Sequence, residues 1–158
     1  MGGEQTKAVV GQWFKAGPSS PEGRAMVTDD FRWIGPASMA DLFDSPDATL
    51  HGPESLADLP CLDKALYRGY EADHANSNVH FMIAEGDIAV MEFDAAFTTH
   101  EGEPYHNQYC LVIKVRGDKV CEVREHADTH YSHEVCMGTP EKRAGVLGRL
   151  AELRAQRV

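Results

Sequence analysis

The chain has 158 residues, of which 42% are hydrophobic, and this is enough for one domain whose core needs no metal or disulfide support. Its 25 acidic and 15 basic residues give a formal net charge of −10, which argues against nucleic acid or an anionic membrane surface as a partner. No run approaches the roughly 20 apolar residues of a membrane span, and the start MGGEQTK lacks the layout of a signal peptide. These observations predict a single cytoplasmic domain. The four cysteines show no CxxC spacing, so we expect them to be reduced.

The amino-terminal third is expected to be mainly helical. Apolar side chains at helical spacing predict a helix over residues 6–16, and Pro21 is typical of the first turn of a second helix. Residues 28–34 predict a short strand. Residues 51–67 predict a further helix, which Pro60 should bend or split.

From residue 79 the hydrophobic period changes to that of strands. The turn sequences AEGD, HEGEP and RGDK separate four strand-like runs within residues 79–131, which predicts an antiparallel meander. A last helix is predicted over residues 139–156, with Thr139 as its cap and Pro140 in its first turn. The order predicts an α+β fold, with helices packed on one face of a curved antiparallel sheet and one domain over residues 1–158.

One carboxylate lies on the apolar side of the last predicted strand. Alternation places Cys121, Val123, Glu125 and Ala127 on one side of this strand. A carboxyl group held among apolar side chains has a raised pKa and can act as a general acid or base. In the alternative reading, Glu125 pairs with a nearby arginine (Arg32, Arg68 or Arg124), or it lies at a frayed strand end in water.

The faces of the strand at residues 88–97 are harder to assign. Glu92 and Asp94 share a side with Ile88 and Val90, while the other side carries Met91 and Phe93 among others. Periodicity therefore leaves open which side faces the helices.

Three short motifs occur in order along the strand region: an AEGD hairpin followed by Val90 and Glu92, the YHNQY start of the next strand, and VREHADT at the end of the last. With these motifs the chain resembles the SnoaL-like branch of the NTF2-like superfamily, which includes polyketide cyclases and ketosteroid-isomerase-related proteins. The resemblance implies a cone-shaped α+β barrel, in which the sheet wraps the amino-terminal helices around a deep apolar pocket. It also implies a homodimer packed through the sheet.

The resemblance also suggests a set of acid and base residues. Related limonene-epoxide hydrolases carry an Arg-x-Asp pair on one strand and an Asp on the last strand, and Glu92, Asp94 and Glu125 are similar to these by position. Glu92 stands where those enzymes have an arginine, which argues against epoxide hydrolysis by their route. If the three carboxylates share one cavity, at least one of them should hold a proton at neutral pH.

Five further residues are candidates for binding a substrate. Asn107 and Tyr109 are candidate hydrogen-bond donors to a developing oxyanion, although a structural strand-start bond and a core ring explain them as well. Trp33 and Tyr67 could line the cavity or form plain core. His80 could reach either the cavity or a dimer surface.

Three histidines near the carboxyl end invite a metal interpretation. His126, His130 and His133 are closely spaced, but ligands three or four residues apart converge on a helix, and His126 lies on a predicted strand. We therefore expect no metal, and the absence of a glycine-rich phosphate loop predicts no nucleotide cofactor.

The sequence thus favours a cofactor-independent acid–base enzyme (an isomerase, cyclase, dehydratase or hydrolase) for a small apolar oxygenated molecule such as a polyketide, terpenoid or steroid-like compound. The alternative is a module of the same fold that binds a small ligand or dimerises without catalysis.

Overall fold

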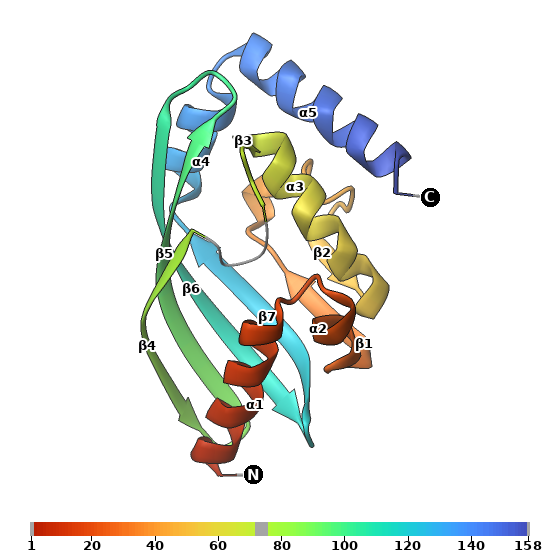
Figure 1. Cartoon of the computed structure of the whole chain (residues 1–158), viewed down its shortest axis with the longest axis vertical. Coiled ribbons are helices and arrows are strands. Elements are labelled where there is room, and N and C mark those ends of the chain that lie inside the picture. The colour runs from red at the N-terminus through yellow and green to blue at the C-terminus, as the bar shows by residue number, and fades with distance from the viewer. Residues whose placement is uncertain (1, 72–75, 158) are drawn as a thin grey trace.

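The computed structural model describes residues 2–71 and 76–157, and it shows a curved sheet with helices packed on one side (Figure 1). The helices are α1 (Gly3–Ala16), α2 (Pro21–Ala25), α3 (Leu59–Leu66), α4 (Thr129–Met137) and α5 (Pro140–Ala155), with short 3-10 turns η1 (Ala37–Met39) and η2 (Pro53–Asp58). The strands are β1 (Val27–Ile34), β2 (Thr49–His51), β3 (Tyr67–Arg68), β4 (Ser77–Glu85), β5 (Ile88–Thr99), β6 (Pro104–Arg116) and β7 (Lys119–Ala127). The mixed α+β class predicted from the sequence is confirmed.

The sheet has the order β2-β1-β7-β6-β5-β3, and β4 pairs with β5 as well. Strands β4 to β7 form the predicted antiparallel meander. The expectation of a wholly antiparallel sheet was wrong, because β1 lies parallel to β7, with Trp33 opposite Val123. Within the described residues the sheet stays open, since β2 ends it on one side and β3 and β4 on the other.

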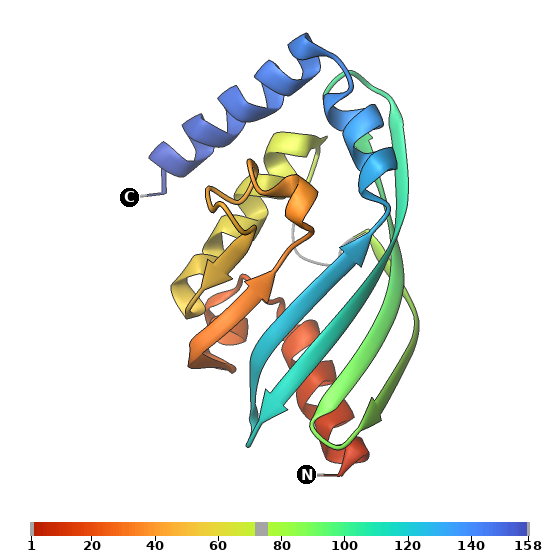
Figure 2. The same cartoon turned by 180° about the vertical axis from the view of Figure 1, so that it is seen from behind.

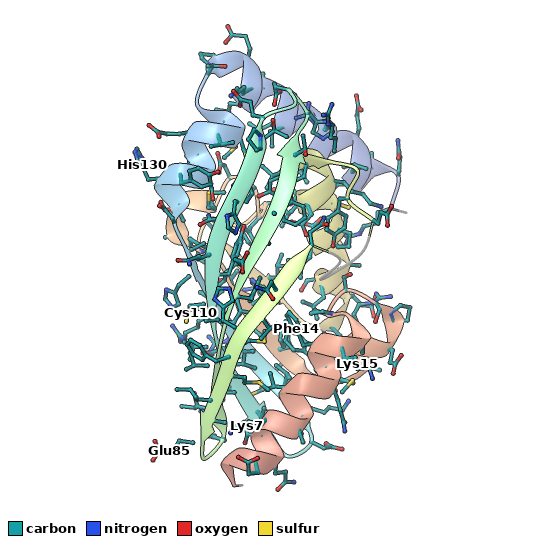
Figure 3. All side chains as sticks on the ribbon, turned by 60° about the vertical axis from the view of Figure 1, so that its left-hand side comes forward. Lys7, Phe14, Lys15, Glu85, Cys110 and His130 are labelled. Carbon is teal, nitrogen blue, oxygen red and sulfur yellow. The ribbon has the colours of Figure 1, made fainter. Side chains whose placement is uncertain are left out.

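In the part of the chain that the structure describes, the helices lie on the concave face of the sheet. The two opposite views place α1, α2, α3 and α5 on the same side of the long strands (Figures 1 and 2). Val10 and Trp13 of α1 are fully buried, and the ring of Phe14, which lies between α1 and the strands in Figure 3, is 5.9 Å from the ring of Phe93. This packing fixes which strand residues face inward.

Most element boundaries follow from local signals in the sequence. The helix predicted over residues 51–67 is divided, as expected, into η2, which ends at Asp58, and α3, which begins at Leu59 with Pro60 in its first turn. Thr139 caps α5 by accepting a hydrogen bond from the Lys142 amide at 3.2 Å. No helix in residues 2–71 and 76–157 is both long and apolar enough to span a membrane.

The prediction that the strand region extends to Tyr131 was wrong. β7 ends at Ala127, and α4 begins two residues later. The cause is Asp128, whose carboxylate accepts a hydrogen bond from the Tyr131 amide at 3.0 Å and so caps the new helix. This turn brings α4 over the upper end of the concave face, where it closes one side of a cavity.

Candidate functional site

A cavity of about 180 Å³ lies between the concave face of the sheet and helices α3 and α4. Its wall is mostly apolar and rich in aromatic rings. The aromatic residues that line it are Trp33, Phe43, Tyr67, Tyr70, Phe93, Phe97, Tyr105 and Tyr109. Only two of the described lining residues carry acidic groups, Asp63 from α3 and Glu125 from β7.

Glu125 faces this cavity from the concave side of β7. Glu125 is half-buried, and its side chain lies on the wall of the cavity. Burial raises the pKa of Glu125, and a hydrogen bond from Trp33 partly opposes that rise. The Trp33 indole Nε1 donates to Glu125 Oε2 at 3.0 Å, which the parallel pairing of β1 and β7 makes geometrically possible.

Two of the three arginines considered as partners for Glu125 lie on the opposite face of the sheet. Arg32 and Arg124 both bind the carboxylate of Glu122, and the Arg124 Nε donates to Glu122 Oε1 at 2.8 Å. Glu122 and Glu125 therefore differ in surroundings although they are three residues apart. The former is a paired surface carboxylate, and the latter is held among apolar groups.

Two tyrosine hydroxyls on the cavity wall belong to one hydrogen-bonded network. The hydroxyl of Tyr109 lies 2.8 Å from that of Tyr105, and Tyr105 Oη is 2.8 Å from Ser132 Oγ. Asn107 Nδ2 donates to Tyr105 Oη at 2.9 Å and to the backbone oxygen of Asp128 at 3.0 Å. Burial raises the pKa of Tyr109 well above its usual value, so the hydroxyl keeps its proton.

The two predicted oxyanion donors differ in their position relative to the cavity. Tyr109 lines the cavity, whereas Asn107 is buried behind it with its amide hydrogens directed at Tyr105, Ser132 and the Asp128 carbonyl. Asn107 thus positions the tyrosines. Tyr105 and Ser132, which the sequence reasoning missed as site residues, line the cavity.

Glu92 and Asp94 lie outside the cavity, on the convex face of β5. The expectation of three carboxylates in one cavity is therefore corrected: the even-numbered side of β5 faces outward, because Met91, Phe93 and Ala95 pack inward. His80 also lies on this outer face, where its Nδ1 is 3.2 Å from Glu92 Oε1 and its Nε2 binds Asp94.

The outer-face group is an ion-pair cluster. Asp94 Oδ2 is also 2.6 Å from His106 Nε2, and Asn78 Nδ2 donates to Asp94 Oδ1 at 3.2 Å. Hydrogen bonds from His106, His80 and Asn78 lower the pKa of Asp94 to about 2. Hydrogen bonds to Glu92 and Asp94 raise the pKa of His80.

The three histidines of the metal interpretation are separated in space. His126 is on the outer face of β7, whereas His130 pairs with Glu134 on α4 at 3.5 Å, and His133 Nε2 is 3.1 Å from the Ser38 carbonyl. Across the described part of the chain, no group of three or more His, Cys, Asp or Glu side chains is arranged to hold a metal ion.

Asp63 is a further cavity residue that was not predicted from the sequence. The sequence does contain a pattern that points to Asp63. An apolar stripe at helical spacing is formed by Leu59, Leu62, Leu66 and Tyr67, and Asp63 lies in the middle of it. The field of the Asp63 carboxylate contributes to the raised pKa of Tyr109, as does that of Glu125.

The comparisons with known proteins agree with this architecture. The model of the SnoaL-like domain family matches residues 20–123, more than half of the chain. The chain therefore belongs to the SnoaL-like domain family. No curated protein matches the sequence.

Solved structures show the same fold at low sequence identity. A protein named as a SnoaL-like polyketide cyclase from Jannaschia sp. CCS1 has 16% identity and a TM-score of 0.67 over 87% of this chain and 95% of its own. TerC, co-crystallised with polyporic acid, has 16% identity and a TM-score of 0.69 over 83% and 97%. A protein with a ketosteroid-isomerase-like fold from Catenulispora acidiphila, in complex with trimethylamine, has 14% identity and a TM-score of 0.56 over 75% and 83%.

Proposed function

We propose that the chain is a cofactor-independent acid–base enzyme, which transfers protons to and from a small, largely apolar oxygenated molecule held in the cavity. The observation that carries this proposal is Glu125, a carboxyl group with a raised pKa on the wall of an apolar cavity. Polyketides, terpenoids and steroid-like compounds are such molecules, and the polyketide cyclase name of one structural neighbour supports the first of these classes.

Glu125 would act as the proton-transferring group. As a carboxylate, it takes a proton from a carbon next to a carbonyl, and the electron pair of the broken C–H bond moves to the carbonyl oxygen. The same carboxyl group then returns the proton at another carbon. Alternatively, the enolate carbon attacks a second carbonyl and closes a ring, and the alkoxide formed there takes the proton back from Glu125. Trp33 orients the carboxyl through its indole hydrogen bond.

Tyr109 would stabilise the negative oxygen that forms in this step. Tyr105 Oη accepts a hydrogen bond from Asn107 Nδ2, and its own proton can bond Tyr109 Oη. The proton of Tyr109 then points to the cavity, where it can bind the developing oxyanion. Tyr109 would be the catalytic hydrogen-bond donor, with Tyr105 and Asn107 as positioning residues.

Deuterium exchange offers a direct test without knowledge of the natural substrate. A panel of small cyclic and aryl ketones is incubated with the protein in D2O, and loss of the hydrogens next to the carbonyl is followed by NMR. We expect catalysed exchange that falls by about 100-fold or more in Glu125→Gln. Glu92→Gln, which removes a carboxylate on the outer face, should leave the rate unchanged.

Two results would count against the enzyme. If Glu125→Gln exchanges as fast as the native protein, Glu125 does not transfer the proton. If ketones bind in the cavity without any exchange, and epoxides and lactones are also unchanged, the chain is a non-catalytic ligand-binding module, the alternative that the sequence left open.

We also propose that two copies of the chain pair through the outer face of the sheet. Three large apolar side chains are exposed there, Phe81, Ile83 and Ile88, and Ile83 is 59% exposed. The same face carries carboxylates on β5 and β7 and cationic side chains on β1 and β7, so a twofold arrangement can match opposite charges. His80 would then belong to the dimer surface.

A further inference from the structure

A groove of about 320 Å³ adjoins the apolar cavity at Glu125. It lies beside the last part of β7, where β1 has already ended. Ile34, the last residue of β1, lies opposite Arg124, whereas β7 continues to Ala127. In the described part of the chain, no strand pairs with β7 on this side beyond Arg124. The groove therefore reaches from the concave side of the sheet at Glu125 to the outer side at Arg124.

Glu125 lies in the wall between the groove and the apolar cavity. Four residues line both spaces: Pro36, Glu125, Ala127 and Thr129. Tyr109 lines the apolar cavity alone, and Arg124 lines the groove alone. Because Ala127 has a side chain of a single carbon, it leaves the least obstruction between the two spaces. A ligand that occupies both spaces would then have Glu125 beside its middle.

The groove differs from the apolar cavity in the charge of its lining. Arg124 and His126 are exposed on its wall, and its one acidic lining residue among those described is Glu125. Burial raises the pKa of Glu125, which lessens its repulsion of an anion at neutral pH. Asp128, the next outward residue of the chain, has its carboxylate bound to the Tyr131 amide at 3.0 Å.

The positive charge of Arg124 is not cancelled by its partner. Arg124 Nε donates to Glu122 Oε1 at 2.8 Å, but Arg32 also binds Glu122, so two guanidinium groups share one carboxylate. Lys114 lies opposite Glu122 on β6 and adds a further positive charge. The bond to Glu122 uses Nε, which leaves the two terminal nitrogens of Arg124 as donors. On a chain with a formal net charge of −10, this local excess of positive charge favours an anionic group.

We propose that the substrate is an oxo acid, whose apolar, carbonyl-bearing body lies in the cavity and whose carboxylate lies in the groove and binds Arg124. This inference rests on the proposed function, since it takes the apolar cavity to be the substrate site. It deepens that function by naming the substrate class and its orientation. The reacting carbon lies beside Glu125, between the carboxylate and the carbonyl oxygen that Tyr109 binds. Arg124 is a recognition residue, and Glu125 is the catalytic one.

The groove is separate from the surface that we assign to the dimer. In the sheet, β6 and β5 lie between β7 and β4, and β4 carries the exposed side chains of Phe81 and Ile83. We therefore expect the anion site to be open in the dimer.

The test compares acids with their own amides, which have nearly the same shape and no charge. The acids are 3-phenylpropanoate, 4-phenylbutanoate and 5-phenylpentanoate, so that the ring can occupy the cavity while the length of the tail varies. Binding to the native protein at pH 7 is measured by tryptophan fluorescence and ligand-observed NMR. For at least one length, we expect the acid to bind about 5-fold more tightly than its amide or better. If no acid binds, or none binds more tightly than its amide, the proposal is overturned.

Variants locate the source of the preference. Arg124→Gln should reduce the preference to less than about 2-fold and leave the affinity for the amide unchanged, whereas Arg124→Lys should retain part of it. Arg116→Gln is the matched control, because Arg116 lies at the other end of the β6–β7 pair and binds Asp30 on the surface. It removes the same unit of charge and should change neither affinity. A preference that survives Arg124→Gln in full would overturn the assignment.

The outcome is separable from that of the proposed function. Glu125-dependent exchange without a preference for the acids removes the anion site and leaves the enzyme. An Arg124-dependent preference without Glu125-dependent exchange supports the anion site and removes the enzyme.

Discussion

At the scale of the residue, the behaviour of Glu125 is determined by a balance of two effects. Loss of hydration in the cavity raises its pKa, and the Trp33 hydrogen bond to the ionised form partly opposes this. Glu122, three residues earlier on the outer face, has a lowered pKa because Arg124 and Arg32 outweigh its partial burial. The chemistry that each carboxyl can perform thus follows from the face on which its strand position lies.

Replacement of Trp33 tests this balance. In Trp33→Phe the ring remains but the indole donor is lost, so the pKa of Glu125 should rise further above its native value. The measurement is a carboxyl-carbon NMR titration. Trp13→Phe is a matched control, because the Trp13 ring lies 6.3 Å from that of Trp33 and its buried Nε1 has no hydrogen-bond partner. A pKa in Trp33→Phe that stays the same or falls would contradict the balance.

The sequence alone predicted some of the site residues and left others undetermined or overlooked. Glu125 was found because it alternates with Val123, which is fully buried on the inner side of β7. The side of Glu92 and Asp94 was undetermined, since both sides of β5 carry apolar residues and only the packing of α1 against Phe93 decides. Asp63 was overlooked although its helical stripe was readable.

At the scale of the element, the outer faces of β4, β5 and β6 are linked by the cluster around Asp94. Because its pKa is lowered to about 2, Asp94 contributes stability above the usual pKa of 3.8, and that contribution is lost as the pH falls through about 2. The pKa of His80 is raised from 6.5, so its contribution is complete below 6.5 and is lost as the pH rises through the raised value. Both contributions coexist only between these limits.

Removal of Asp94 should therefore destabilise the fold in a pH-dependent way. The free energy of unfolding is measured by urea titration. Its value for Asp94→Asn should be lower than for the native protein, and this difference should be larger at pH 5 than at pH 9. Asp118→Asn, on the exposed turn between β6 and β7, should show no such difference. A deficit as large at pH 9 as at pH 5 would show that the histidines do not participate.

Helix α5 is held to the rest of the fold by a second ion-pair group. Asp58 is only 7% exposed and accepts bonds from Arg154 Nη2 at 2.6 Å and Arg157 Nη1 at 2.7 Å. Arg154 also donates to the Leu42 carbonyl at 2.6 Å. Arg154→Leu leaves Asp58 with one partner and should lower the free energy of unfolding by about 2 kcal/mol, measured by urea titration. A change within about 0.5 kcal/mol, as for most surface substitutions, would contradict this role.

The elements were predictable where the signal was local. The proline-initiated start of α5 and the split at Pro60 depend on neighbouring residues alone. The start of α4 was missed because apolar alternation runs past the Asp128 cap, and β2 and β3 were missed because strands of three and two residues carry almost no periodic signal. The parallel pairing of β1 with β7 is a long-range contact that no local pattern encodes.

At the scale of the whole molecule, the two faces of the sheet have different roles. The concave face carries the cavity, and the convex face carries the exposed apolar side chains that we assign to a dimer. Ile83→Asp should convert the protein to a monomer, because it places a charge in the centre of that interface. Analytical ultracentrifugation is the measurement. Ala151→Asp, at an exposed position of α5, should leave the dimer intact.

A native protein that sediments as a monomer would contradict this assembly, and so would an Ile83→Asp variant that remains a dimer. The cavity lies on the opposite face, so neither result bears on the acid–base chemistry.

The proposed chemistry depends on the raised pKa of Glu125, because this carboxyl group must exchange protons with a ligand in the cavity. The most direct measurement is the titration of its carboxyl carbon by NMR in the native protein, with Glu125→Gln to assign the resonance. We expect one resonance, absent in Glu125→Gln, that titrates above 4.5, the usual pKa of a glutamate side chain. If the Glu125 resonance titrates at or below that value, the carboxyl is an ordinary solvated acid, and the proposed chemistry loses its basis.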